Sequence, residues 1–265
     1  MIEPPDPATA STLARLYDLD LEDDPGDLDL YLALADRADG RILELGAGTG
    51  RLAVPLAAAG HTVTAVDIDP AMLERARERA ASAGVPDGRL ELVDGDLLDL
   101  HLPDAGRYAM AFIGLNSIML LATRDAQRRA FERLALHLAP GGLAVVDVWL
   151  PDIEDLGRFD ARPILEWVRP DETVGGDGSL VTKMGSAIHD AATGTIALTA
   201  IYEAASQGAT PRRWIRQDRL RLVSADELRA FAEDAGLAVE MIAGGYDLGP
   251  IGPGAERAVL IAERR

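Results

Sequence analysis

The sequence contains no cysteine, which excludes disulfide bonds and thiolate metal sites. Basic residues are also scarce: 26 Lys and Arg stand against 44 Asp and Glu, a net charge of −18. A protein this acidic repels phosphate backbones and anionic lipid surfaces, so nucleic acid and membrane partners are disfavoured. No apolar run approaches the ~20 residues that span a bilayer, and residues 1–6 do not resemble a signal peptide. We therefore expect a cytoplasmic protein.

Hydrophobic residues make up 48% of the 265, enough for a substantial core. Apolar strands are predicted at 41–45, 62–66, 90–93, 108–113 and 143–149, and helices at 50–59, 70–83 and 124–138. Because strands and helices alternate, the fold class is α/β, with a doubly wound, Rossmann-like, mostly parallel sheet.

The pattern changes after residue 149. Segments 164–168, 180–190, 195–204 and 212–223 are rich in β-forming residues and separated by turns. They predict an antiparallel β meander inserted after the fifth strand. Ser224 and Glu227 form a capping box that opens a helix, and strands at 238–242 and 258–262 complete a seven-stranded main sheet.

Three domains are therefore expected. Residues 1–40 form an N-terminal helical cap, with helices around 13–17 and 27–38. Residues 41–150 and 224–265 form the Rossmann-like domain, and residues 151–223 form an antiparallel β lid or substrate subdomain.

The most informative stretch is residues 42–50, where an apolar strand with Glu44 near its end runs into Gly46, Gly48 and Gly50. Glycines allow positive φ and close approach of the backbone to a ligand. A dinucleotide fingerprint would read G-x-G-x-x-G, and a P-loop would need Lys followed by Ser or Thr. The observed G-x-G-x-G spacing disfavours both, including an NAD dehydrogenase.

Two acids follow the next two strands. Asp67 ends the second strand, where a carboxylate can accept hydrogen bonds from both hydroxyls of a ribose. Asp96 follows the third strand, where it can accept from an adenine amino group while Leu97 covers the ring. The structural alternative for Asp67 is an acid at a helix N-terminus, a role that suits Asp69 better. The structural alternative for Asp96 is a simple Asp-Gly-Asp turn.

Together, the glycine loop, Asp67, Asp96 and the turn at 138–143 resemble the class I S-adenosylmethionine-dependent methyltransferases, over roughly residues 40–150 and the C-terminal elements. The resemblance implies S-adenosylmethionine as cofactor and S-adenosylhomocysteine as product. The residues expected to bind the cofactor are Tyr17, Glu44, Gly46, Ala47, Gly48, Arg51, Asp67, Ile68, Met72, Gly95, Asp96, Leu97 and Leu115. Tyr17 and Arg51 would reach its carboxylate, and Met72 and Ile68 would pack on its adenine.

The substrate side follows the fourth strand. Residues 116–118 read Asn-Ser-Ile, unlike the Asn/Asp-Pro-Pro-Tyr type of motif in the DNA amino-methyltransferases of the family. The meander resembles the lid sheets of small-molecule methyltransferases. The residues expected to bind the acceptor are Asn116, Ser117, Trp149, Tyr202, Trp214, Arg216 and Tyr246. For the aromatic residues, packing within the protein is an equal alternative.

A methyl acceptor can require a general base. His189 is the best candidate, and Glu203 and Asp147 are weaker ones; proximity and desolvation alone can also suffice, because the sulfonium is already activated. No metal-ligand spacing is visible.

Five arginines between 212 and 221 predict an exposed strand that pairs with nearby acids or with a second copy of the chain. The sharper alternative is a contact for an anionic substrate group.

The sequence thus predicts methyl transfer from S-adenosylmethionine to an O or N atom of a small molecule. Two alternatives stay open. The scaffold also supports other enzyme classes, such as cyclisation, decarboxylation or aminopropyl transfer, because a fold does not fix a function. A non-catalytic cofactor-binding module is the second.

Overall fold

The computed structural model describes residues 5–21, 25–171, 174, 178–206, 208 and 210–265. They fall into two compact units, one holding residues 1–23 and 151–221 and the other residues 24–150 and 222–265. Among the described residues, no helix combines the length and the apolar character needed to cross a bilayer.

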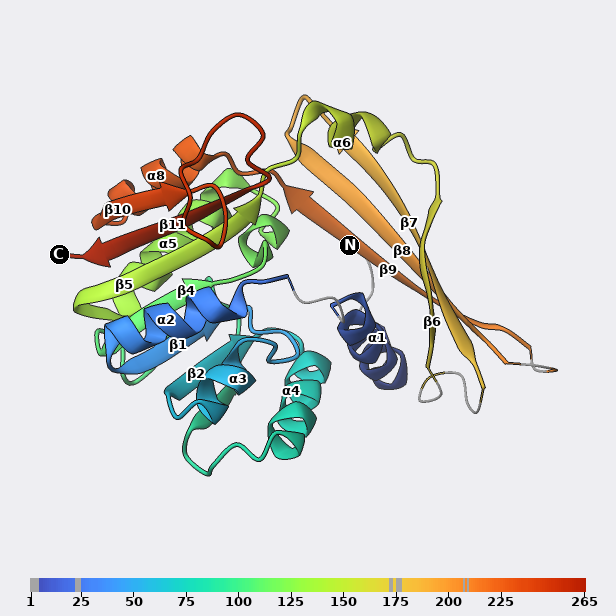
Figure 1. Ribbon diagram of the computed structural model, residues 1–265, viewed down its shortest axis with the longest axis horizontal. Coiled ribbons are helices and arrows are strands. Elements are labelled where there is room, and N and C mark those ends of the chain that lie inside the picture. The colour runs from blue at the N-terminus through green and yellow to red at the C-terminus, as the bar shows by residue number, and fades with distance from the viewer. Residues whose placement is uncertain (1–4, 22–24, 172–173, 175–177, 207, 209) are drawn as a thin grey trace. The chain divides into compact units, whose positions relative to one another are not determined.

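The larger unit is built on a seven-stranded sheet with helices on both faces (Figure 1). Its strands are β1 (Arg41–Leu45), β2 (Thr62–Asp67), β3 (Leu90–Asp94), β4 (Tyr108–Ile113), β5 (Leu138–Trp149), β10 (Leu237–Ala243) and β11 (Arg257–Arg264). Its helices are α2 (Leu28–Ala38), α3 (Ala53–Ala58), α4 (Pro70–Ser82), α5 (Arg124–His137) and α8 (Ala225–Asp234), with a short 3₁₀ turn η1 (Ser117–Leu120).

The strand order is β10-β11-β5-β4-β1-β2-β3. Strands β1 to β5 pair in parallel, and β11 runs antiparallel to both β5 and β10. The predicted mostly parallel seven-stranded sheet is therefore confirmed. Strand β5 begins earlier than predicted, at Leu138, because its first residues already pair with β4 before a register shift.

Two cores hold the helices to this sheet. On one face, Tyr31 of α2 packs on Phe112 of β4 with ring centroids 4.7 Å apart. Phe131 of α5 and Phe231 of α8 pack 5.9 Å apart. Full burial of such aromatic side chains contributes roughly 1.5–3 kcal/mol each. The capping box predicted at Ser224 and Glu227 is present and fixes the start of α8.

The smaller unit contains a four-stranded antiparallel sheet in the order β6-β7-β8-β9, which confirms the predicted meander (Figure 1). The strands are β6 (Ile164–Pro170), β7 (Leu180–Asp190), β8 (Thr195–Ala205) and β9 (Arg212–Arg221), and the helices are α1 (Pro7–Asp20) and α6 (Ile153–Arg158). Helix α6 was not predicted, although Asp152 and Asp155 form its capping box.

Helix α1 is longer than the piece predicted at 13–17, because Asp6 caps it and Pro7 suits its first turn. Its residue Leu16 is buried with Tyr202 and Trp214 of the sheet. At its end, Asp20 accepts hydrogen bonds from the indole of Trp167 and the hydroxyl of Tyr202. Helix α1 thus packs with the four-stranded sheet, and α2 packs with the main sheet. The domain bounds expected from the sequence stay a prediction.

Candidate functional site

The carboxyl ends of β1, β2, β3 and β4 line one edge of the main sheet, and most of the predicted cofactor residues follow these ends. From β1, the chain builds outward through β2 and β3 on one side, while β4 and β5 lie on the other. The order therefore reverses between β1 and β4. In open α/β sheets, ligands bind in the crevice at such a reversal.

The glycine loop is fixed by backbone contacts. Gly46, Gly48 and Gly50 have φ of 77°, 55° and 74°, a left-handed conformation that other residues rarely adopt. The amide of Gly46 donates to the carbonyl of Val66 at 2.8 Å, which ties the loop to β2. A Cβ on Gly50 would lie 3.0 Å from the side chain of Ala76, so this glycine allows α4 to pack closely. The loop thus brings bare backbone to the reversal point.

Glu44, on β1 just before the loop, is a buried acid with an unsatisfied oxygen. Glu44 is 4% exposed. Burial raises the pKa of its carboxyl to about 8, although the nearby charge of Arg51 acts in the opposite direction. No described residue donates a hydrogen bond to Glu44 Oε2, and the buried Thr49 Oγ1 of the loop also lacks a partner. Buried polar atoms without partners are rare and costly. These two atoms are therefore polar groups at the loop that protein contacts leave unsatisfied.

Asp67 lies at the end of β2, opposite the loop. One carboxylate oxygen accepts from the amide of Gly48 at 2.7 Å, and the other accepts from the amide of Asp69 at 2.9 Å. Burial raises the pKa of Asp67 in spite of these two donors. Each carboxylate oxygen has two lone pairs, so acceptor capacity remains for further donors.

The residues predicted to hold an adenine lie on neighbouring segments. Asp96 is exposed, and its Oδ1 accepts from the amide of Leu98 at 2.8 Å. Gly95 donates to the carbonyl of Asp67 at 3.0 Å, which joins the end of β3 to that of β2. Ile68 is 66% exposed, an unusual state for isoleucine, whereas Met72 is buried on α4.

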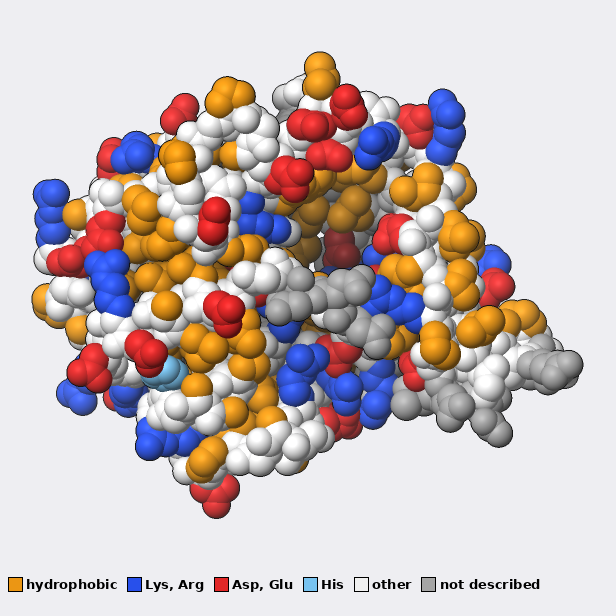
Figure 2. Space-filling model, viewed as in Figure 1, with side chains coloured by type: hydrophobic (Ala, Val, Ile, Leu, Met, Phe, Trp, Pro, Cys, Tyr) orange, Lys and Arg blue, Asp and Glu red, His pale blue; other side chains and the backbone are white. Residues whose placement is uncertain are grey.

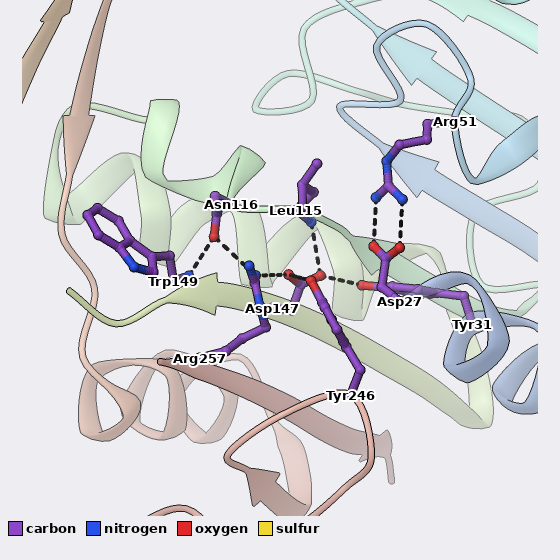
Figure 3. Close-up of polar contacts among 9 residues, drawn as sticks. All are labelled: Asp27, Tyr31, Arg51, Leu115, Asn116, Asp147, Trp149, Tyr246 and Arg257. Atoms are coloured by element: carbon purple, nitrogen blue, oxygen red, sulfur yellow. Dashed lines mark hydrogen bonds and ion pairs between the residues drawn. The ribbon is translucent and has the colours of Figure 1, made fainter. Parts of the chain in front are cut away.

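Arg51, predicted to reach the cofactor, forms a bidentate ion pair with Asp27. Both N–O distances are 2.6 Å, and Asp27 is fully buried just before α2 (Figure 3). A paired, two-pronged geometry of this kind is the strong form of an ion pair. Tyr17, the other residue predicted to bind the carboxylate of the cofactor, belongs to the smaller unit.

Asp147 is a third buried acid, near the end of the apolar strand β5. It accepts hydrogen bonds from Tyr31 Oη at 2.6 Å, Tyr246 Oη at 2.9 Å and Arg257 at 2.8 Å. The amide of Leu115 donates to it at 2.9 Å (Figure 3). These four donors use the acceptor capacity of the carboxylate, so Asp147 holds its neighbours in place and is not suited to act as a general base.

Asp147 thereby supports a strained turn after β4. Leu115 and Asn116 both have positive φ, 46° and 66°. The left-handed conformation costs on the order of 1–2 kcal/mol per residue, and persists only where the surroundings enforce it. The next residue, Ser117, places its hydroxyl 3.5 Å from the carbonyl of Gly46. The turn therefore lies against the glycine loop.

Trp149 ends β5 in the larger unit, and the predicted substrate residues not described above lie in the smaller unit. The guanidinium of Arg216 stacks over the ring of Tyr17, 5.3 Å from its centroid, and pairs with Asp218 at 2.7 Å. Tyr202 and Trp214 are buried in the core that α1 and the sheet share. His189 is half-buried on β7, opposite Ile196 of β8.

Three arginines of strand β9 contact side chains of the same four-stranded sheet. Arg213 pairs with Glu203 at 2.7 Å, and Arg216 pairs with Asp218. Arg212 stacks over Trp214 at 4.8 Å. These contacts agree with the prediction of a strand that pairs with nearby acids.

Sequence reasoning missed Asp27, Tyr31 and Arg257, and considered Asp147 only as a weak base. Asp147 interrupts an apolar run, which signals a buried acid that needs partners. Nothing in the pattern identifies those partners, because Tyr31 and Arg257 lie 116 and 110 residues away along the chain.

Comparison with known proteins agrees with this geometry. Residues 42–142 match the family model described as a methyltransferase domain. The resemblance to S-adenosylmethionine-dependent methyltransferases is thus confirmed for this segment, which holds the glycine loop, Asp67, Asp96 and the Leu115–Asn116 turn.

Two curated relatives extend the comparison. A carboxy-S-adenosyl-L-methionine synthase from Chromohalobacter salexigens is 34% identical over 127 residues, covering 45% of this chain and 44% of that protein. The chain therefore spans less than half the length of this relative. A cypemycin N-terminal methyltransferase from Streptomyces sp is 27% identical over 230 residues, which cover 86% and 84% of the two chains.

Two solved structures share the fold along nearly the whole chain. A S-adenosylmethionine-dependent methyltransferase from Clostridium acetobutylicum superposes with a TM-score of 0.77 at 16% identity, covering 96% of this chain and 98% of that one. The CcbJ methyltransferase from Streptomyces caelestis superposes with a TM-score of 0.68 at 25% identity, covering 99% and 97%.

The buried acid Glu44 makes a prediction about stability and pH. Its pKa is raised in the folded protein, from 4.5 to about 8, so the folded state keeps a proton that the unfolded state has lost. The stability of the wild type should fall over this pH range relative to Glu44→Gln, by at most about 1.4 kcal/mol per pH unit. Urea unfolding between pH 5 and 9 measures the difference, which should level off above about pH 8.

The matched control is Glu233→Gln on α8, where the glutamate is exposed. Its unfolding free energy should differ from the wild type by an amount that does not change over the same range. Parallel curves for Glu44→Gln and the wild type would show that Glu44 is not held protonated by the fold.

Proposed function

We propose that this protein transfers a methyl group from S-adenosylmethionine to an O or N atom of a small-molecule acceptor. The observation that carries the proposal is the buried Glu44, with an unpartnered oxygen, beside a left-handed glycine loop at the reversal point of the sheet. It lies in the segment that matches a methyltransferase domain.

The residues present fit the cofactor. Asp67 has acceptor capacity for ribose hydroxyls, and exposed Ile68 offers an apolar surface to an adenine ring. Asp96 and Leu97 would bind the edge and the face of that ring. Glu44 would accept a hydrogen bond from the cationic ammonium group, with the backbone at Gly46, Ala47 and Gly48 around the methionine part. Arg51, held by Asp27, and Tyr17 would bind its carboxylate.

When bound, the cofactor supplies a methyl group already activated by its sulfonium, for transfer by an SN2 displacement. Leu115 would contact the cofactor, and Asn116 and Ser117 would face the acceptor together with Trp149 and Tyr246. We propose residues 151–223 as the lid and substrate subdomain that excludes water. His189 and Arg216 are its candidate residues, with His189 as the base, whereas Tyr202 and Trp214 are buried in the core with α1 and are not offered to a substrate.

The charge of the chain supports a small-molecule acceptor. At −18, the protein repels nucleic acid and anionic membranes. One relative, which aligns with 86% of this chain, is named a cypemycin N-terminal methyltransferase, and the relative from Chromohalobacter salexigens is named a carboxy-S-adenosyl-L-methionine synthase. A cytoplasmic location is part of the proposal.

The first experiment incubates the protein with methyl-labelled S-adenosylmethionine and a fractionated metabolite extract. We expect label in a small-molecule product and one equivalent of S-adenosylhomocysteine. Consumption of cofactor without label transfer would instead indicate another reaction class, and binding without consumption would indicate a binding module.

A matched pair of variants tests the cofactor site in the same preparation. Asp67→Asn should weaken S-adenosylhomocysteine binding at least tenfold by calorimetry. Asp69→Asn should change it less than twofold, because asparagine also caps α4. Equal affinities for both variants would remove Asp67 from the site.

We also propose that the chain forms a homodimer through its four-stranded sheet. Leu165, Met184, Ile201 and Ile215 face each other across all four strands, so they form one apolar row on one face. Leu165 is 63% exposed and Ile215 is 55% exposed. Hydrophobic side chains are visible along this sheet in Figure 2.

A second copy suits this face because the pattern is self-complementary. On β7, Leu180 and Ile188 lie four residues to either side of Met184, and both are about half exposed. A two-fold axis along the row would place Leu180 of one copy over Ile188 of the other. The face measures ~19 by ~35 Å, or roughly 650 Å², close to the ~800 Å² per partner of a standard interface.

Light scattering after size exclusion tests the dimer. The wild type should have twice the chain mass of 28.2 kDa. Ile215→Lys should yield a folded monomer, because it buries a charge in the interface. Ile153→Lys, at an isoleucine 87% exposed on α6, should stay dimeric. A wild type that runs as a monomer at tens of micromolar would refute the proposal.

A further inference from the structure

Asn116 is the only asparagine among the 265 residues, and it occupies a left-handed position. Glycine fills such a position without steric cost, and the described part of the chain uses glycine at 14 positions of positive φ. A glycine at 116 would give the turn its shape. The asparagine side chain therefore has a use beyond the conformation of the backbone.

One end of this side chain is occupied. Asn116 Oδ1 accepts a hydrogen bond from the backbone amide of Trp149 and lies 3.4 Å from the guanidinium of Arg257 (Figure 3). Both neighbours are donors, and a guanidinium has no acceptor to offer. The oxygen of the amide must therefore face them, and Nδ2 must point the other way.

Arg257 cannot easily leave this position. Its guanidinium donates to Asp147 at 2.8 Å, and its charge lies over the ring of Tyr246, 4.8 Å from the centroid. Asp147 is fully buried and is itself held by Tyr31 and Leu115. These contacts connect the side-chain amide of Asn116 to β5, β11, the turn after β4 and α2.

The two N–H groups of Asn116 Nδ2 remain available for a hydrogen bond to a ligand. Asn116 is half-buried, and none of the described residues accepts a hydrogen bond from Nδ2. Its neighbour Ser117 touches the carbonyl of Gly46 in the glycine loop. Asn116 Nδ2 is thus an oriented hydrogen-bond donor, because the oxygen of the same amide is already used. It lies next to Ser117, which contacts the glycine loop.

Building on the proposed methyltransferase function, we propose that Asn116 Nδ2 donates a hydrogen bond to an oxygen of the methyl acceptor, a hydroxyl, carbonyl or carboxylate. Arg257 is the positioning residue that fixes the amide in this orientation. An ammonium group has no lone pair and finds no partner at Nδ2. The site therefore selects acceptors that carry an oxygen near the methylated atom.

Asn116→Asp is the sharpest variant. Aspartate tolerates the left-handed conformation and keeps the oxygen that faces Trp149 and Arg257, but it replaces the donor with an acceptor. With the acceptor found by label transfer, kcat/KM should fall at least 20-fold, mainly through KM. The affinity for S-adenosylhomocysteine should stay within twofold. Ser82→Asp, which adds the same charge at an exposed site at the end of α4, should leave both values unchanged.

Arg257→Met should lower kcat/KM about tenfold in the same way, and Arg257→Lys should recover part of the loss, since lysine also only donates. Because the chain has one asparagine, labelling with [15N]asparagine gives one side-chain NH₂ pair in an NMR spectrum. Arg257→Met should shift or broaden that pair, with or without S-adenosylhomocysteine.

The outcomes separate the two proposals. A wild type that neither binds S-adenosylhomocysteine nor transfers label refutes the proposed function, while the NMR pair still tests the orientation of Asn116. An NH₂ pair unchanged in Arg257→Met, or an Asn116→Asp variant with wild-type kcat/KM, overturns the inference. A loss of cofactor affinity in Asn116→Asp equal to the loss of kcat/KM would also overturn it, because the turn would then serve the cofactor alone.

Discussion

The architecture of the site depends on how two buried acids are satisfied. Asp147 on β5 is surrounded by four donors, which come from α2, the turn after β4, the loop before β11 and β11 itself. Glu44 on β1 is equally buried, yet one of its oxygens has no partner among the described residues. Burial disfavours the charged carboxylate and raises the pKa of Glu44 to about 8, although the charge of Arg51 and a hydrogen bond from the backbone of Ala53 act in the opposite direction.

This contrast assigns different tasks to the two acids. Asp147 is a structural centre, and the strained Leu115–Asn116 turn persists because this centre holds it. Glu44 is the part of the site that protein contacts leave incomplete. Preorganised groups on rigid strands beside an incomplete one are the arrangement expected where a ligand supplies the missing partner.

The sequence predicted those features that have local signals. Strand and helix alternation predicted the sheet, and the glycine spacing with Asp67 predicted the loop and its neighbour on β2. The pairing of Arg51 with Asp27, and of Asp147 with Tyr31, Tyr246 and Arg257, could not be predicted. These contacts join residues far apart in the chain, and helix α6 was missed because only six residues form it.

The central claim is that the cofactor completes the environment of Glu44. A cationic ammonium beside this carboxyl would favour its ionised form, so binding at pH 7 should release close to one proton. Calorimetry of S-adenosylhomocysteine binding in two buffers of different ionisation enthalpy measures the proton count. We predict release of about one proton for the wild type and none for Glu44→Gln. Binding without proton release in the wild type, or the same release in both proteins, would contradict the account.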